Sequence, residues 1–253
     1  RLLKKKMTIE YCTNCVLPSC KPVTAKEGNK TTASATSTIN FQEGVCEACR
    51  WNVIKENSID WKAREIELEK LLDRYRSSDG SYDVIVPASG GKDSVYVSHI
   101  LKHKYGMTPL TVTWAPSLWT EQGRRNQENL VKSGFDNILI SPNGEIHRLL
   151  TKLAFKKLGH PFQPFIFGQR SVGPKMALKH NVSLVFYGEN VAEYGNPLEE
   201  NYNPQMDVNL FTNYNIKDPK TMLAGHTIDE LDANLKIKQK DLNAYNPPTQ
   251  SEL

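Results

Sequence analysis

The segment from Tyr82 to Ser94, YDVIVPASGGKDS, constrains the fold of this chain more than any other. It begins with a short apolar run ending at Pro87, continues through the glycine pair Gly90 and Gly91, and leads into a helical pattern. Glycine lets the backbone approach a ligand closely, and the N–H groups that open a helix attract anions. We therefore expect a strand, a phosphate-cradling loop and a helix in succession.

Strand and helix patterns alternate through the rest of the central region. Several expected helices end at a glycine, as at Gly106 and Gly134, which is typical of helix C-termini. Such alternation predicts parallel strands joined by crossover helices. The predicted fold is α/β, an open parallel sheet with helices on both faces. The expected strands are 82–87, 109–114, 137–140 and 183–187, and the expected helices are 93–105, 124–133, 146–158 and 165–180.

The pattern of large apolar residues divides the chain into regions. The N-terminal region has few of them and includes a polar stretch, 24–40, that we expect to be a flexible insertion. Helical spacing of leucines after Asp60 predicts a connecting helix. A capping box at Thr227 predicts a last helix to about Leu242. The predicted regions are 1–55, 56–80, 81–225 and 226–253.

Composition favours a soluble, cytoplasmic protein. No apolar run approaches the roughly 18 residues needed to span a bilayer, so we expect no membrane insertion. The formal net charge of +4 is modest for 253 residues, and nucleotide phosphates would satisfy it as well as RNA would. We therefore expect no nucleic-acid partner.

All five cysteines lie at the N-terminal end of the chain, and four of them form two CxxC pairs. Because no secretion signal is evident, metal binding in a reducing compartment is favoured over disulfides. Four thiolates in two such pairs suit a structural Zn²⁺. Redox or iron–sulfur chemistry and unliganded thiols are the alternatives, and Cys20 is a spare thiol. The predicted zinc ligands are Cys12, Cys15, Cys46 and Cys49.

The loop residues have side chains that suit phosphate binding. Ser89 and Ser94 can donate hydroxyl hydrogen bonds, Lys92 adds a cation, and Asp93 can hold Mg²⁺ or orient the loop. A Walker A sequence, GxxxxGK[ST], occurs nowhere in the chain. A generic turn rich in serine and glycine is the alternative. The predicted ATP-binding residues are Ser89, Gly90, Gly91, Lys92, Asp93 and Ser94, of which Lys92 and Asp93 are also the predicted catalytic residues.

The SGGKDS pattern, in its strand-to-helix context, resembles the PP-loop of the ATP pyrophosphatases. The resemblance implies cleavage of ATP between its α- and β-phosphates, adenylation of a carbonyl or amide oxygen, and release of pyrophosphate. A nitrogen or sulfur nucleophile then displaces AMP. It also implies that the end of the second strand, near Thr113 and Trp114, flanks the adenine.

Further polar candidates follow the fourth expected strand and lie on the preceding helix. Ligands of open α/β sheets bind at the carboxyl edge of the strands, which is where the sequence YGEN is expected. Loop capping and solvated helix charges are the alternative explanations. The candidate substrate or metal contacts are Gln169, Arg170, Glu189, Asn190 and Glu193.

The absence of cysteine after Cys49 separates nitrogen transfer from sulfur transfer. Many relatives that thiolate tRNA carry sulfur or a cluster on cysteines within the ATP-binding domain, and this domain has none. Glutamine hydrolysis also normally needs a catalytic cysteine, and we find no glutaminase site. Ammonia is therefore expected from a partner or from solution.

Five stretches together resemble the N-acetyl sugar amidotransferases of bacterial surface-polysaccharide and nonulosonic-acid pathways. This family implies conversion of an acetamido group on an activated or acidic sugar, such as a nucleotide sugar, to an acetamidino group during synthesis of lipopolysaccharide or flagellin-glycan precursors. It also implies a separate glutaminase subunit, with a cyclase-like channel subunit, that supplies the ammonia. The stretches are YCTNCVLP at 11–18, FQEGVCEACR at 41–50, PASGGKDS at 87–94, KLGHPFQPFIFGQ at 157–169 and YGENVAEYG at 187–195.

The chain departs from this family in two features. The segment between the CxxC pairs is longer and more polar than the family's spacer. Family members also continue beyond the position of Leu253, which would make this chain a fragment lacking part of the substrate site. The alternative enzyme is a tRNA-modifying PP-loop ATPase with a zinc knuckle, and a non-catalytic, zinc-stabilised scaffold is a third hypothesis.

Overall fold

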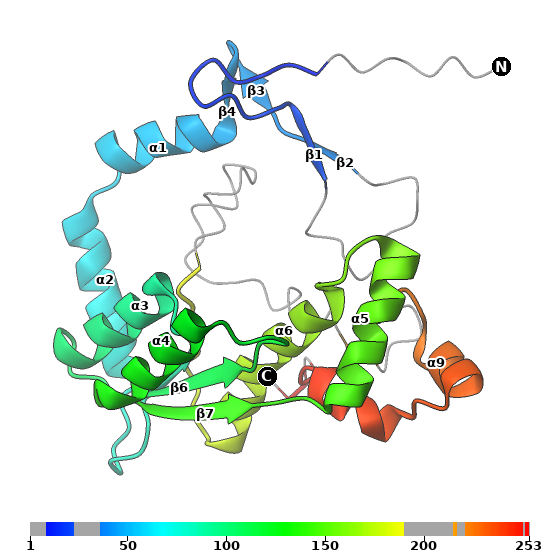
Figure 1. The fold of residues 1–253 in the computed structure, drawn as a ribbon. Helices are drawn as coiled ribbons and strands as arrows, with labels where there is room; N and C mark the ends of the chain where they lie inside the picture. Colours follow the sequence, from blue (N-terminus) through cyan, green and yellow to red (C-terminus); the bar gives the residue numbers. More distant parts are fainter. Residues whose placement is uncertain (1–8, 23–35, 190–214, 217–220, 250, 253) are drawn as a thin grey trace. The chain divides into compact units, whose positions relative to one another are not determined.

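The computed structural model describes residues 9–22, 36–189, 215–216, 221–249 and 251–252 (Figure 1). Contacts divide the chain into two compact units. The first comprises residues 1–64 and 190–206, and the second comprises residues 65–189 and 207–253. Among the described residues, no helix combines the length and apolar character needed to cross a membrane.

The second unit is built on a parallel sheet of three strands in the order β5-β6-β7. These strands are β5 (Val84–Pro87), β6 (Pro109–Trp114) and β7 (Asp136–Ile140). The expected fourth strand is reduced to a parallel bridge between Val185 and Ile85, on the side of β5 away from β6. Two backbone hydrogen bonds, from Ile85 to Leu184 and from Phe186 to Ile85, hold it there at 2.9 Å each. The predicted α/β class is confirmed.

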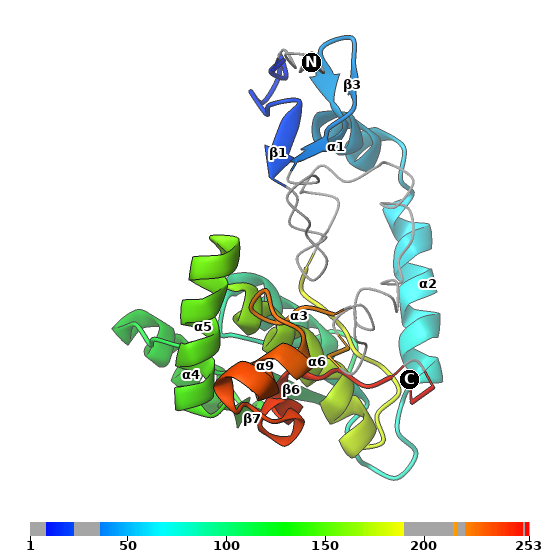
Figure 2. The same ribbon diagram turned by 90° about the vertical axis from the view of Figure 1, so that its right-hand side faces the viewer.

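Helices cover both faces of this sheet because neighbouring strand residues point to opposite sides. Val84 and Val86 pack with Leu101 of α3 (Lys92–His103), whereas Ile85 belongs to the larger core on the other face. Helix α4 (Glu121–Lys132) lies on the α3 face. The opposite face carries α5 (Gly144–Leu158) and α6 (Gln163–Lys179). Figure 2 shows α6 beside β6 from a second direction.

The C-terminal helix is shorter than the sequence predicts. The Thr227–Glu230 capping box does open α9 (Ile228–Leu235), but the helix stops at Lys236, whose φ of 60° is left-handed. The N–H of Ile237 then donates to Leu231, which lets the buried Ile237 side chain enter the core. A 3₁₀ helix, η2 (Gln239–Tyr245), follows.

The strands described in the first unit are short. β1 (Cys20–Pro22) pairs antiparallel with β2 (Thr36–Thr38), and β3 (Phe41–Gln42) pairs with β4 (Val45–Cys46). The end of the expected flexible insertion therefore forms β2, while residues 23–35 lie outside the described residues. Two helices follow, α1 (Glu47–Asn57) and α2 (Trp61–Arg74), and the unit boundary falls within α2.

Candidate functional site

The loop between β5 and α3 has a backbone that favours glycine at position 90. Gly90 has a φ of +77°, which is strained for any residue with a Cβ atom. A Cβ added there would also lie 3.1 Å from backbone atoms of Asn126 and Gln127 in α4. The glycine expected from the sequence is therefore favoured both by conformation and by close packing.

The loop leads into the N-terminus of α3, where backbone N–H groups are exposed to a ligand. Its N-cap is Gly91, so no side chain caps the helix. The side chains of Thr120, Asn143 and Thr227 cap α4, α5 and α9 by accepting hydrogen bonds from their first turns, whereas α1 and α6, like α3, begin without a side-chain cap. A helix start with no side-chain cap offers its N–H groups and its positive dipole end to an anion.

The predicted catalytic pair lies at this helix start. Lys92 Nζ contacts Asp93 Oδ1 at 2.6 Å, and both side chains are mostly exposed. Ser94 Oγ donates to the Gly91 carbonyl at 3.2 Å, and Ser89 is exposed on the loop. A cation, a carboxylate and two hydroxyl groups thus surround the start of α3, which is a donor set suited to a magnesium-bound phosphate.

The YGEN segment packs directly on the same helix start. A Cβ added to Gly188 would lie 2.9 Å from the backbone of Asp93 and Ser94, so Gly188 rests against the first turn of α3. Glu189 follows Gly188 and is exposed. The structure therefore places Glu189 at the predicted carboxyl edge, whereas Asn190 and Glu193 lie outside the described residues.

The remaining candidate residues lie on α6 and β6. Gln169 is exposed and Arg170 is half-buried. Burial raises the pKa of Tyr187, the first residue of YGEN, and Arg170 lies close enough for its charge to oppose that rise. Thr113 is buried, and its hydroxyl donates to the Ala88 carbonyl at 2.6 Å. An ATP contact by Thr113 stays a prediction, since what the structure shows is a bond to the start of the loop.

A hydrogen-bonded cluster that the sequence reasoning missed also lies at the carboxyl edge. Buried His147, in the first turn of α5, contacts Ser117 Oγ through Nε2 at 2.9 Å and Tyr245 Oη through Nδ1 at 2.8 Å. Burial lowers the pKa of His147, which keeps the ring neutral. No local motif links these residues, because Tyr245 comes from η2 at the far end of the chain.

The four predicted zinc ligands come together in the first unit. Their Sγ atoms all lie within 4.8 Å of one another, with Cys15 and Cys46 3.5 Å apart and Cys12 and Cys49 3.9 Å apart. These separations exceed the roughly 2.05 Å of a disulfide bond. A tetrahedral zinc site with Zn–S bonds of about 2.3 Å has sulfur separations of about 3.8 Å. The cluster therefore fits a zinc ion.

The backbone around the cluster favours thiolate at one ligand. The N–H groups of Asn14 and Cys46 donate to Cys12 Sγ at 3.4 and 3.3 Å. Backbone hydrogen bonds, the strongest of them from the Cys46 N–H, outweigh burial and lower the pKa of Cys12 to about 6. Burial raises the pKa of Cys46 and of Cys49, so a cation is the partner that would stabilise four thiolates together.

No family model matches the chain, and no curated protein matches it in sequence. The structure by itself therefore establishes the architecture. This is a small parallel α/β sheet with a nucleotide-binding-like loop, together with a four-cysteine cluster near the N-terminus.

Proposed function

We propose that this chain binds ATP at the loop between β5 and α3, adenylates an amide oxygen of an N-acetylated sugar, and replaces that oxygen with ammonia. The single observation that carries the proposal is the α3 N-terminus, which begins at two glycines without a side-chain cap. Lys92, Asp93 and the Gly188 segment gather around it at the carboxyl edge of a parallel sheet.

The proposed chemistry follows from these groups. The N–H groups of α3 and Lys92 would hold the phosphates that leave as pyrophosphate, and Asp93 would hold Mg²⁺. Adenylation turns the amide oxygen into a good leaving group, so that ammonia forms an acetamidino group and displaces AMP. The choice of nitrogen is supported by the lack of cysteine after Cys49. The choice of an acetamido sugar is supported by the resemblance to the sugar amidotransferases.

The direct test is turnover with free ammonia, because this bypasses the glutaminase and channel partners. The protein is incubated with ATP, Mg²⁺, ammonium and a panel of N-acetylated nucleotide sugars. AMP and pyrophosphate should form in equal amounts, and the sugar product should be one mass unit lighter than the substrate by mass spectrometry. Absence of AMP with every sugar would contradict the proposal. AMP formation stimulated only by tRNA would favour the tRNA-modifying alternative instead.

Loop variants connect turnover to the proposed site. Lys92→Ala and Asp93→Ala should each lower kcat/KM by about 10- to 100-fold, because each removes a charged contact worth roughly 1.5–3 kcal/mol. Lys152→Ala, on the exposed surface of α5, is the control for loss of a lysine charge. ATP binding that survives both loop changes without AMP ever forming would support the scaffold hypothesis.

A further inference from the structure

Helix α4 and strand β6 hold the β5–α3 loop through a buried set of polar contacts, which we call the loop brace. In the brace, Gln127 hydrogen-bonds to Thr113, and Thr113 hydrogen-bonds to Ala88, the residue that precedes Ser89. Both polar groups of the Ala88 backbone are bonded to β6: its N–H donates to Val112 O at 2.8 Å, and its carbonyl accepts from Thr113 Oγ1 at 2.6 Å.

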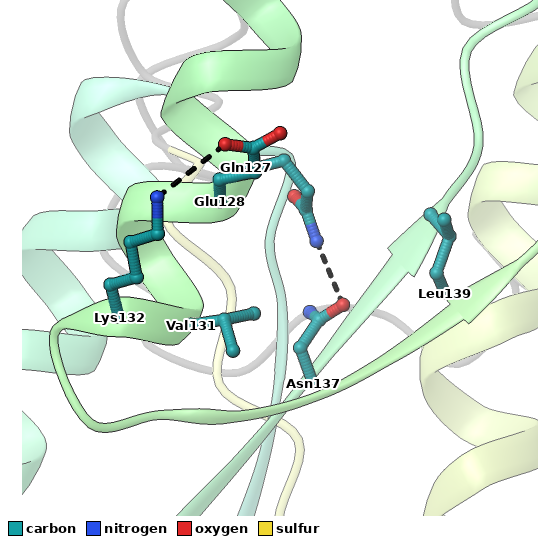
Figure 3. Close-up of a pocket in the computed structure, with 6 residues that line it drawn as sticks. All are labelled: Gln127, Glu128, Val131, Lys132, Asn137 and Leu139. Atoms are coloured by element: carbon teal, nitrogen blue, oxygen red, sulfur yellow. Dashed lines mark hydrogen bonds and ion pairs between the residues drawn. The ribbon is translucent and has the colours of Figure 1, made fainter.

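The Thr113 hydroxyl is fixed by neighbours as well. Gln127 Nε2 donates to Thr113 Oγ1 at 3.2 Å and to Asn137 Oδ1 at 2.8 Å, and Asn137 Nδ2 donates to Thr113 Oγ1 at 3.0 Å. Figure 3 shows Gln127 reaching from α4 to Asn137 on β7. With two donors aimed at its oxygen, the Thr113 hydroxyl has one proton to give, and the Ala88 carbonyl receives it.

The same turn of α4 also touches the loop on its other side. The backbone of Asn126 and Gln127 lies against Gly90, where a Cβ would come within 3.1 Å. Helix α4 therefore limits the loop at Gly90 by contact and at Ala88 through Thr113. A loop that must present N–H groups to phosphate gains affinity when its geometry is set before binding.

We propose that Thr113 is a positioning residue, which orders the β5–α3 loop for phosphate through Ala88 rather than by touching ATP. The expected effect on ATP binding rests on the proposed function, whereas the ordering of the loop does not. The side chain itself is only 1% exposed, with its hydroxyl directed at a loop carbonyl. On this proposal Thr113 acts from behind the loop, whereas the resemblance to the ATP pyrophosphatases implies a place beside the adenine.

Thr111 supplies a matched control two residues earlier on the same face of β6. It is also fully buried, it accepts from Asn137 Nδ2 at 2.9 Å, and it donates to a backbone carbonyl at 2.6 Å. That carbonyl belongs to Asp136 in β7 and not to the loop. Thr111→Val and Thr113→Val therefore remove equivalent hydroxyl groups, and only the second removes a loop contact.

The experiment compares the two valine variants in the full chain by hydrogen exchange of the loop amides and by ATP affinity. Thr113→Val should speed exchange across residues 88–92 and weaken ATP binding by about tenfold, while Thr111→Val leaves both within about twofold. Thr113→Ser, which restores the hydroxyl, should restore both. Both valine variants should lose similar thermal stability.

Three results would overturn the inference. The first is equal loop exchange in the two valine variants. The second is weaker ATP binding by Thr113→Val with loop exchange unchanged, which indicates direct contact with the nucleotide. The third is failure of serine to rescue the loop. Failure of the proposed function is seen separately, as absence of ATP binding by the unaltered chain, because hydrogen exchange measures the brace without nucleotide.

Discussion

Individual side chains in this protein take their properties from neighbours that are distant in sequence. His147 shows this most clearly, since it lies between Ser117 and Tyr245 and is 6% exposed. Tyr245 has no other hydrogen-bond partner among the described residues, so its O–H is best satisfied by donating to Nδ1. The Nε2–H of the neutral ring then donates to Ser117 Oγ.

The titration of His147 predicts how stability depends on pH. Its pKa is lowered in the folded state, so below the ordinary histidine value of about 6.5 the unfolded chain binds the proton more readily. Stability contributed by the neutral ring is complete above that pH and is lost as the pH falls below it. The urea midpoint should therefore drop between pH 7.5 and 5.5, and less so in His147→Gln.

The control is His99→Gln, which changes an exposed histidine on α3. It should keep the acid sensitivity of the unaltered protein. An equal loss of stability in acid for His147→Gln and the unaltered protein would contradict this assignment.

At the scale of elements, the contact between α3 and the segment after the fourth strand defines the candidate site. Gly188 leaves no space for a side chain against the backbone of Asp93 and Ser94. The contact brings the start of α3 against the segment that follows residues 184–186. Those residues pair with β5 through a single bridge and two backbone hydrogen bonds. The site therefore depends on how closely these two segments approach.

Gly188→Ala should separate the two segments. Forcing a methyl group into this contact is expected to cost about 1–3 kcal/mol of unfolding free energy and to weaken ATP binding. Gly144→Ala, at a helix start where a Cβ meets nothing within 4 Å, is the matched control and should change neither. Unfolding curves and ATP titration measure both effects. Unchanged ATP affinity in Gly188→Ala would show that this packing does not shape the site.

At the scale of the whole molecule, the chain holds two units whose apolar cores differ in size. The second unit has an extensive apolar core, whereas the described part of the first has a small one centred on Cys12, Ile39 and Cys46. So small a core offsets little conformational entropy, and a structural zinc can contribute on the order of 10–16 kcal/mol. Metal binding and folding should therefore be coupled in the first unit.

Zinc removal should affect the two units differently. The purified chain should bind one zinc ion, and a strong chelator should abolish amide protection in α1 and the short strands while β5, β6 and β7 stay protected. Cys46→Ser should lose zinc, because it removes one of the four clustered sulfur atoms, and Cys20→Ser should keep it, because four ligands remain. Elemental analysis with hydrogen exchange measures both, and full protection of the first unit without metal would contradict the coupling.

Local patterns in the sequence were sufficient for much of this structure. Apolar runs and glycine stops predicted β5, β6, β7 and the helices between them, because burial and chain reversal act on neighbouring residues. The CxxC pairs predicted the four-sulfur cluster for the same reason, since each pair already sets two ligands close together.

Tertiary structure alone decided which polar groups meet. It shortened the last helix at Lys236 so that Ile237 could be buried, reduced the fourth strand to a single bridge, and directed the Thr113 hydroxyl to Ala88 rather than to a ligand surface. It also joined Ser117, His147 and Tyr245. A sequence pattern reports which residues are apolar and where the chain turns, whereas a hydrogen bond between distant segments depends on how their elements pack.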